Sequence, residues 1–306
     1  MKRHATNPEN AIHVGGVVGL GRERSEKYGR VRLPTSESKD ALRVFYRNRH
    51  SSLTIKRYKI GRTAGMSDRS SKNSYSDTWL ELFLPLAASA QSEVEAAFII
   101  RNLPRSRYQS VVDLCCGNGR HARLLAAAGY EVTATDNNRN AIDEAISASG
   151  EPITYMVMDM RSVRELAGTF DAFINLWQSF GYFDERTNLE VLRQIAEKLN
   201  PGGRLILDIY DRRFFEKHLG VRRIEKPGVV VTESSRMTGH RLQVTLTYDD
   251  RVETDAFDWQ LYTPQELTRE LESLGCRNLV ACADFDESRP ATGDRPRMQL
   301  VFEKTA

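Results

Sequence analysis

The spacing of apolar residues changes near residue 74. From there, apolar side chains recur at helical intervals in "DTWLELFLPL" and "SEVEAAFIIRNL", which predicts two amphipathic helices. Strand-like runs and amphipathic helices then alternate. The pattern predicts strands at 110–114, 130–135, 153–157, 170–175 and 204–209, helices at 119–128, 138–148 and along Leu189, Leu192, Ile195 and Leu199, and a turn at "NPGG". Strands that are separated by helices indicate a parallel sheet with helices on both faces.

The pattern becomes all-β after the fifth of these strands. "VVVTESSR", "RLQVTLTYD" and "AFDWQLY" are strand-like and are joined by short turns, which predicts an antiparallel insertion over residues 221–262. This insertion is expected to form a lid or a dimer contact. "TPQEL" then begins a helix, with Thr263 as N-cap, Pro264 in the first turn and Glu266 completing a capping box. Two further strands, "RNLVACADF" and "MQLVFEK", follow with the polar loop "DESRPATGDRPR" between them.

Residues 1–73 lack sustained periodicity and contain one strand-like run, "ALRVFYRNR". They hold 17 Lys and Arg against 6 Asp and Glu, whereas residues 74–306 hold 27 against 35. Such a composition buries too little apolar surface to offset the entropy lost on ordering. We expect a poorly ordered basic arm on a domain that spans 74–306. The arm could contact nucleic acid or an anionic surface, or have no specific role.

Several classes of protein are excluded by composition. No apolar run approaches the length of a membrane span, and no apolar core of a secretory signal follows the basic start. The four cysteines lack metal-ligand spacing, because Cys115 and Cys116 are adjacent and no C-x-x-C pair occurs. The sequence therefore predicts a cytoplasmic protein without a structural zinc or another metal.

The segment "VVDLCCGNGRHARLL" runs from a strand through a glycine turn into a helix. Its "GNGRHA" fits the G-x-G-x-x-A pattern of dinucleotide sites, which by itself is weak. Asp136 ends the next strand, 17 residues after Gly119, and could accept hydrogen bonds from ribose hydroxyls in either NAD or S-adenosylmethionine. Two further acids favour S-adenosylmethionine. Asp113 could hold an ammonium group and Asp159 an adenine amine.

At these motifs residues 73–306 resemble the class I S-adenosylmethionine-dependent methyltransferases. "VVDLCCGNG" resembles the family's first motif, "TATD" the second, "DM" the third, "INLWQSFGYF" the fourth and "NPGGRLILDIY" the fifth. The resemblance implies an α/β, Rossmann-like, seven-stranded and mostly parallel sheet that ends in a reversed β-hairpin. The fourth motif and the β-insertion are most similar to those of small-molecule methyltransferases, especially aminosugar and glycine-type N-methyltransferases. One departure is Cys115, which stands where the family's first glycine is usual.

The resemblance also implies roles for individual residues. Those expected to bind the cofactor are Tyr75, Asp113, Cys115, Gly117, Asn118, Gly119, Arg120, Asp136, Asn137, Asp159, Met160 and Leu176, with His121 as an alternative to Arg120. Trp177 is expected to wall the methyl-transfer chamber. Candidates for a base are Tyr182 and His218, together with Asp208 and Tyr210. Structural roles compete with these assignments: Asp113 could hold the loop, Asp159 could cap a helix, and Trp177 could be core.

The sequence thus predicts methyl transfer by in-line displacement to a fairly hydrophobic small molecule of specialised metabolism, in a protein that forms a homo-oligomer. Three other functions stay open. The basic arm would suit an RNA methyltransferase, although "NLWQ" stands where a motif for flipped bases is expected. A cofactor-binding partner protein without activity and an NAD-dependent oxidoreductase are the others.

Overall fold

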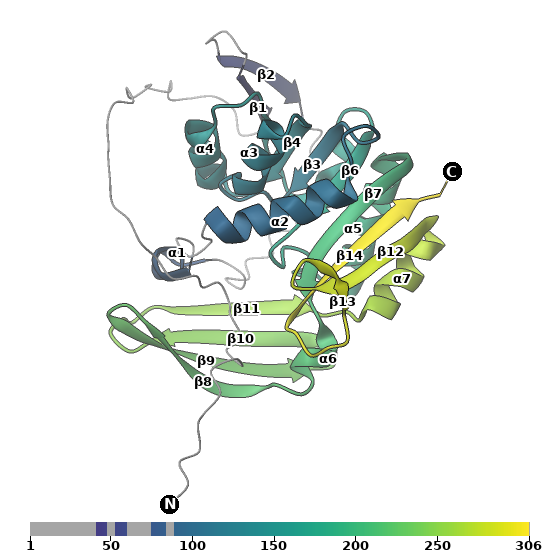
Figure 1. Ribbon diagram of the computed structural model, residues 1–306. Helices are drawn as coiled ribbons and strands as arrows, with labels where there is room; N and C mark the ends of the chain where they lie inside the picture. Colours follow the sequence, from purple (N-terminus) through teal and green to yellow (C-terminus); the bar gives the residue numbers. More distant parts are fainter. Residues whose placement is uncertain (1–40, 48–52, 60–74, 84–88, 306) are drawn as a thin grey trace, which may run out of the picture.

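A computed structural model describes residues 41–47, 53–59, 75–83 and 89–305 of the chain, the first two ranges as backbone only. These residues form two β-sheets with helices around the larger one (Figure 1). The remainder of the predicted arm lies outside the described residues. The strand-like run expected near residue 41 is one of two strands there, β1 (Ala41–Arg47) and β2 (Leu53–Lys59).

The larger sheet has ten strands in the order β13-β12-β14-β7-β6-β3-β4-β5-β1-β2. Its centre is parallel, from β7 through β6, β3 and β4 to β5, and β14 runs antiparallel to both β7 and β12. The bounds are β3 (Ser110–Leu114), β4 (Glu131–Asp136), β5 (Thr154–Val157), β6 (Phe170–Asn175), β7 (Leu199–Tyr210), β12 (Cys276–Ala283), β13 (Asp286–Pro290) and β14 (Arg297–Lys304). The seven strands from β12 to β5 confirm the predicted Rossmann-like class with a reversed hairpin.

Helices cover both faces of this sheet, as the alternating pattern predicts. One face packs against α2 (Ser89–Asn102), α3 (Arg120–Ala127) and α4 (Arg139–Ala148). The other packs against the 3₁₀ helix η3 (Met160–Glu165), α5 (Glu185–Lys198) and α7 (Pro264–Ser273). The capping box that begins α7 is confirmed, because Glu266 N donates to Thr263 Oγ1 and Thr263 N donates to Glu266 Oε2.

The insertion is a separate antiparallel sheet in the order β11-β10-β9-β8. Its strands are β8 (Gly220–Lys226), β9 (Val229–Thr238), β10 (Arg241–Tyr248) and β11 (Thr254–Gln260). In Figure 1 it lies below the larger sheet, beside α1 (Asp77–Phe83) and α6 (Arg212–Phe215). The sequence pattern predicted three of these four strands. It missed β8 because this edge strand is mostly exposed and charged, without a buried alternation.

Three other expectations were wrong in detail. "NPGG" is not a separate turn, because β7 begins at Leu199 and passes through these residues with an irregular register against β6. Leu199 therefore starts a strand and does not extend the face of α5. The polar loop after β12 contains the short strand β13, whose side chains are largely exposed and whose backbone pairs with β12.

Candidate functional site

The turn between β3 and α3 adopts a left-handed backbone at three positions. The φ angles are 65° at Cys115, 55° at Gly117 and 73° at Gly119. Glycine is required at 119, since a Cβ there would lie 2.8 Å from the Tyr155 hydroxyl. At Gly117 no atom lies within 4 Å of an added Cβ, so its backbone borders open space. The turn therefore offers exposed backbone of the kind that a cofactor can approach.

Asp136 joins this turn to the end of β4. Its Oδ2 accepts from Gly117 N at 2.9 Å, and its Oδ1 accepts from Asn138 N at 2.8 Å. Burial raises the pKa of this carboxyl, and the backbone donors oppose the shift. Each carboxylate oxygen keeps a second acceptor site, which suits a pair of ribose hydroxyls. Asn137, beside it, is exposed at the same edge.

Asp113 is 2% exposed, and its Oδ2 has no hydrogen-bond partner among the described residues. Burial, with a smaller contribution from Asp136, raises its pKa to about 7, although the charge of Arg120 opposes the shift. A buried carboxyl oxygen without a partner needs an explanation. An ammonium group of a bound ligand would satisfy it.

Asp159 has a different environment from the one expected. It is the N-cap of η3, and its two oxygens form an ion pair with Arg161, the closest atoms being 2.7 Å apart. Burial alone would raise its pKa, but Arg161 lowers it. The alternative of a helix cap is thus the role that the structure shows. Met160, which follows it, is buried in the core beneath η3.

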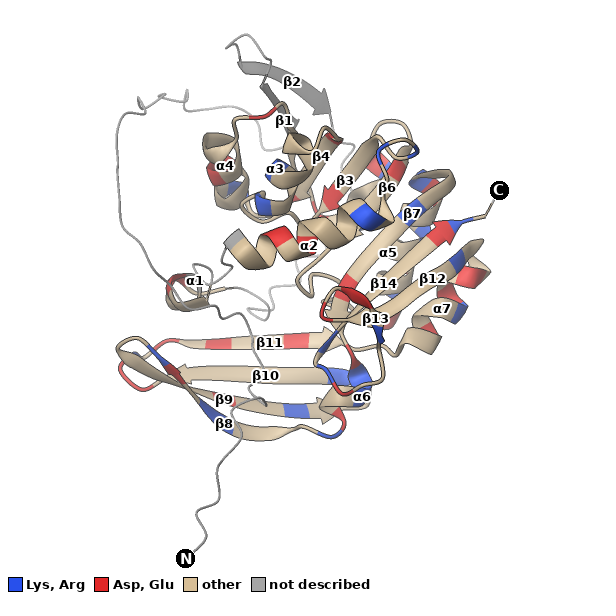
Figure 2. Ribbon diagram, in the orientation of Figure 1, with Lys and Arg blue, Asp and Glu red and all other residues tan. Residues whose placement is uncertain are grey.

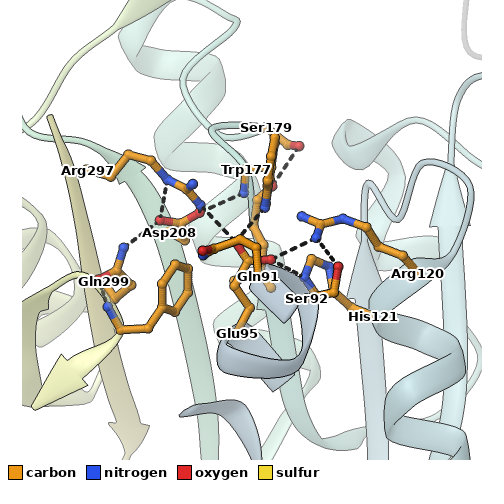
Figure 3. A network of polar contacts seen from close by, with 12 residues as sticks. Gln91, Ser92, Glu95, Arg120, His121, Trp177, Ser179, Asp208, Arg297 and Gln299 are labelled. Atoms are coloured by element: carbon orange, nitrogen blue, oxygen red, sulfur yellow. Dashed lines mark hydrogen bonds and ion pairs between the residues drawn. The ribbon is translucent and has the colours of Figure 1, made fainter. Parts of the chain in front are cut away.

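A buried set of ionic and polar side chains lies beside the turn (Figure 3). We call it the charge network, and it consists of Glu95, Arg120, His121, Trp177, Asp208, Arg297 and Gln299. Glu95 is its centre. Its Oε2 lies 2.9 Å from Arg120 and 2.7 Å from His121, and its Oε1 accepts from the Trp177 indole at 2.8 Å.

The second acid of the charge network, Asp208, faces β14. It forms a two-point ion pair with Arg297 and accepts from Gln299 Nε2 at 2.7 Å. Burial alone would raise the pKa of Glu95, but the hydrogen bond from His121 and the charges of Arg120 and Arg297 lower it to about 2. Burial lowers the pKa of His121, so its imidazole is neutral near pH 7. Two acids thus balance two guanidinium groups.

The charge network changes the roles expected for several residues. Arg120 and His121, the candidates to hold the cofactor's carboxylate, both bind Glu95, and the buried Nη2 of Arg120 has no hydrogen-bond partner among the described residues. Trp177 is neither a simple wall nor plain core, because its ring lies between Arg120 and Arg297, whose Cζ atoms are 4.3 Å and 5.0 Å from the ring centroid. The Leu176 carbonyl accepts from the Ser179 hydroxyl at 3.0 Å. One lone pair of that carbonyl remains for a ligand.

Aromatic side chains from several segments pack together against the insertion. We call this the aromatic cluster, and it consists of Tyr75, Trp79, Tyr182, Tyr210, Phe257 and Trp259. The Tyr75 and Tyr182 hydroxyls are hydrogen-bonded to each other, and Tyr182 stacks on Trp259 at 5.8 Å. Desolvation is the main cause of the raised pKa of Tyr75, and Asp136 and Cys115 make smaller contributions in the same direction. The hydroxyl pair therefore joins Tyr75, which precedes α1, to Tyr182 in the segment between β6 and α5.

The insertion fixes the start of α1. Asp255, which is 2% exposed, accepts from Ser76 N at 2.8 Å, from Ser76 Oγ at 2.7 Å and from the Tyr248 hydroxyl at 2.5 Å. This anchor holds Tyr75, the neighbouring residue, against Phe257. Sequence reasoning missed Asp255, because an acid in a strand with no motif around it gives no functional signal.

Two other predicted site residues do not join these groups. His218 is exposed, its Nδ1 lies 2.8 Å from the Phe214 carbonyl, and its ring stacks on Phe214 at 4.0 Å. These contacts hold it just beyond α6, and its assignment as a base stays a prediction. Asn118 turns its side chain toward Glu144 on α4, with 3.3 Å between the bonded atoms, and only its backbone belongs to the turn.

Comparison with known proteins assigns a family to this geometry. Residues 111–203, which contain the turn, Asp136 and Trp177, match the family model described as "Methyltransferase domain". Residues 111–203 of this chain are thus similar to a methyltransferase domain. The resemblance to the class I S-adenosylmethionine-dependent methyltransferases is thereby confirmed, and S-adenosylmethionine is the cofactor of that class.

Relatives of this methyltransferase domain are distant. The Bacillus subtilis protein YqeM, named as a methyltransferase, is 30% identical over 103 residues, which are 33% of this chain and 42% of YqeM. Glycine/sarcosine/dimethylglycine N-methyltransferase of Actinopolyspora halophila is 26% identical over 210 residues, 64% of this chain and 36% of that enzyme. The chain thus spans less than half the length of these two relatives.

Solved structures of methyltransferases share the fold of most of this chain. The sugar N-methyltransferase KedS8 from a Streptoalloteichus species has a TM-score of 0.59 at 19% identity, over 80% of this chain and 100% of KedS8. At this identity the likeness describes the fold alone. Among the described residues, no helix has the length and apolar character needed to cross a membrane.

Proposed function

We propose that this protein transfers a methyl group from S-adenosylmethionine to an amine nitrogen of a small, fairly hydrophobic molecule in specialised metabolism. The observation that carries this proposal is the turn between β3 and α3, where Gly117 borders open space and the buried Oδ2 of Asp113 has no partner among the described residues. Support for nitrogen comes from relatives and structural neighbours whose names specify N-methylation, of glycine and sarcosine in one case and of a sugar in another.

The residues of the turn fit the cofactor. Asp136 would hold the ribose, the backbone of Cys115 and Gly117 would border the methionine portion, and Asp113 would meet its ammonium group. The unpartnered Oδ2 of Asp113 and the open space beside Gly117 support this placement. When bound, S-adenosylmethionine supplies a methyl group on a sulfonium centre that a nucleophile can attack.

The chain's own contribution to the reaction is positioning. Pockets for small ligands are mostly apolar with few polar groups, which the aromatic cluster provides through its rings and the two tyrosine hydroxyls. Aromatic faces also attract positive charge, which would favour the charge that develops on nitrogen as the neutral amine attacks the methyl group. Burial raises the pKa of Tyr182 well above its usual range, so its hydroxyl stays protonated. We expect Tyr182 to orient the acceptor by hydrogen bonding, because a group of that pKa is poorly matched to act as a base near neutral pH.

The proposal is tested in two steps with the full chain. Calorimetric titration with S-adenosylhomocysteine is expected to show binding, whereas NADH is expected to show none. Release of S-adenosylhomocysteine is then measured with a panel of matched amines and alcohols of increasing hydrophobicity. Turnover with amines supports the proposal. Absence of S-adenosylhomocysteine binding, or methylation of the alcohols alone, would overturn it.

The nucleic-acid alternative has less support from the described residues. Figure 2 shows their Lys and Arg interspersed with Asp and Glu on the helices and on both sheets, without a basic stripe along one element. Phosphate recognition draws on such stripes. Turnover on RNA that is lost on deletion of residues 1–65, with small amines inactive, would favour this alternative. A homo-oligomer and a lid role for the insertion remain predictions.

A further inference from the structure

The turn that follows β6 is strained and is held by the charge network. We infer that Asp208 and Glu95 are positioning residues, which fix residues 176–178 in the conformation that faces the cofactor. The inference rests on the proposed function, because it takes Leu176 and Trp177 to border the bound cofactor. It goes beyond that function by assigning a role to two buried acids that are both held in ion pairs.

The first argument is the backbone. Trp177 and Gln178 have φ angles of 58° and 56°, so two consecutive residues with a Cβ occupy the left-handed region. This conformation is unfavourable for such residues and persists only where surrounding contacts determine it. Asp208 supplies those contacts. Its Oδ2 accepts from Trp177 N at 2.9 Å, and its backbone carbonyl accepts from Gln178 N at 3.0 Å.

The second argument is the side chain of Trp177. Glu95 Oε1 accepts from its indole Nε1 at 2.8 Å, and the guanidinium groups of Arg120 and Arg297 lie near its ring, 4.3 Å and 5.0 Å from the centroid. Figure 3 shows the indole within this ring of charged side chains, which come from α2, α3, β7 and β14. Elements far apart in the sequence therefore converge on one residue of the turn.

The third argument is charge balance. Glu95 and Asp208 are 0% exposed and are paired with Arg120 and Arg297, while His121 is neutral. Because the acids and the guanidinium groups are paired with one another, the charge network acts as a rigid support for the turn. Neutralising one acid would leave a buried guanidinium group with a weaker partner, which is strongly unfavourable. The turn would then lose its support on that side.

The chain offers a matched control at the opposite end of the same strand pair. Glu303 on β14 is 5% exposed and pairs with Arg204 on β7 at 3.0 Å and with Arg277 at 2.8 Å. Arg204 and Glu303 lie at one end of the β7–β14 pairing, whereas Asp208 lies toward its other end. Glu303→Gln removes a comparable buried charge without touching residues 176–178.

The experiment measures binding of S-adenosylhomocysteine by calorimetry and thermal unfolding for Asp208→Asn, Glu95→Gln and Glu303→Gln. We expect all three variants to lose thermal stability. The first two should bind S-adenosylhomocysteine about ten-fold or more weakly, since each weakens a charge-assisted hydrogen bond, and Glu303→Gln should stay within about two-fold. Equal losses in all three, or unchanged affinity in the first two, would overturn the inference.

A double-mutant cycle separates positioning from general destabilisation. Trp177→Phe keeps an aromatic ring and removes the indole donor to Glu95. If Glu95 acts through Trp177, Glu95→Gln should weaken binding by less than about two-fold in the Trp177→Phe background, whereas independent effects would be additive. Additive losses would overturn the role of Glu95. The cycle leaves Asp208 intact, so it decides the role of Glu95 even if Asp208→Asn does not fold.

The wild-type titration distinguishes the two proposals. If the wild-type chain does not bind S-adenosylhomocysteine, the proposed function fails before any variant is compared. If the wild type binds and the Asp208 and Glu95 variants bind equally well, the positioning role alone is wrong.

Discussion

The two regions beside the carboxyl edge of the parallel sheet are built differently. The turn between β3 and α3 and the charge network are fixed by paired charges and short hydrogen bonds, with Glu95 and Asp208 fully buried. The aromatic cluster is made of rings in tilted and stacked contact, tied by the hydroxyl pair of Tyr75 and Tyr182 and by the Asp255 anchor.

Under the proposed function, this difference matches what each region would recognise. A cofactor with a ribose and an ammonium group needs donors and acceptors at fixed positions, and buried ionic groups hold such positions because their unpaired states are costly. Aromatic surfaces bind through shape and area, and they tolerate different acceptors. Variants in the two regions should therefore separate cofactor affinity from acceptor affinity.

The largest effect is expected at Asp136. Asp136→Ala removes the acceptor for Gly117 N and Asn138 N as well as the proposed ribose contact. The proposed hydrogen bonds from the two ribose hydroxyls to this carboxylate would be lost, which should weaken S-adenosylhomocysteine binding about 100-fold. Calorimetry tests this, with Asp143→Ala at a half-buried position of α4 as control. Unchanged affinity would count heavily against the cofactor site described above.

A variant in the aromatic cluster is expected to show the opposite effect, which is weaker binding of the acceptor with unchanged affinity for the cofactor. Trp259→Leu removes the ring that stacks on Tyr182 and keeps an apolar side chain. The KM for the amine acceptor should rise about ten-fold, since a ring–ring contact and apolar area are lost together, while S-adenosylhomocysteine affinity stays the same. Steady-state kinetics at saturating cofactor provide the measurement. A parallel loss of cofactor affinity would contradict the separation of the two regions.

A pH effect should be confined to the cofactor region. The pKa of Asp113 is about 7 in the ligand-free protein, so this carboxyl is largely protonated at lower pH. A ligand ammonium group favours the carboxylate, so binding releases a proton. S-adenosylhomocysteine affinity should therefore rise by up to about ten-fold per pH unit as the pH approaches 7 from below, and then level off. Asp113→Asn should flatten this profile in calorimetric titrations, and a pH dependence that survives the substitution would exclude Asp113 as its source.

A smaller effect on the acceptor side is expected from the anchor of α1. Asp255→Asn keeps one oxygen acceptor and loses the charge that holds Ser76 and Tyr248. Tyr75 should then be held less firmly, and the acceptor KM should rise about three- to ten-fold with cofactor affinity unchanged. The exposed neighbour Thr254 provides the control Thr254→Val. If the acceptor KM is unaffected in both variants, the anchor does not act on the acceptor site.

The smallest effect is expected at the turn itself. Cys115 has a φ of 65°, which glycine adopts without the steric penalty of a Cβ. Cys115→Gly should raise the free energy of unfolding by up to about 1 kcal/mol and leave methyl transfer intact, as thermal unfolding and turnover would show. Burial and Asp136 raise the pKa of its thiol, which makes it a poor nucleophile. Loss of turnover with intact cofactor binding would mean that the thiol takes part in the reaction.

The sequence by itself determined the alternation of strands and helices, the glycine turn with Asp113 and Asp136, and the capping box of α7. These features are local, because strand pleat, helix period and caps involve residues a few positions apart. Their predicted bounds agree with the structure to within one or two residues for β3, β4, β6 and α4.

Only the tertiary structure decided which polar groups meet. Glu95, Trp177 and Arg297 are far apart in the sequence, and an ion pair leaves no periodic signal that would join them. The same holds for Asp255 and Ser76, and for the exposed position of His218. The edge strands β8 and β13 were missed for a related reason. They are held by backbone pairing to a neighbouring strand, so their side chains need not alternate between apolar and polar.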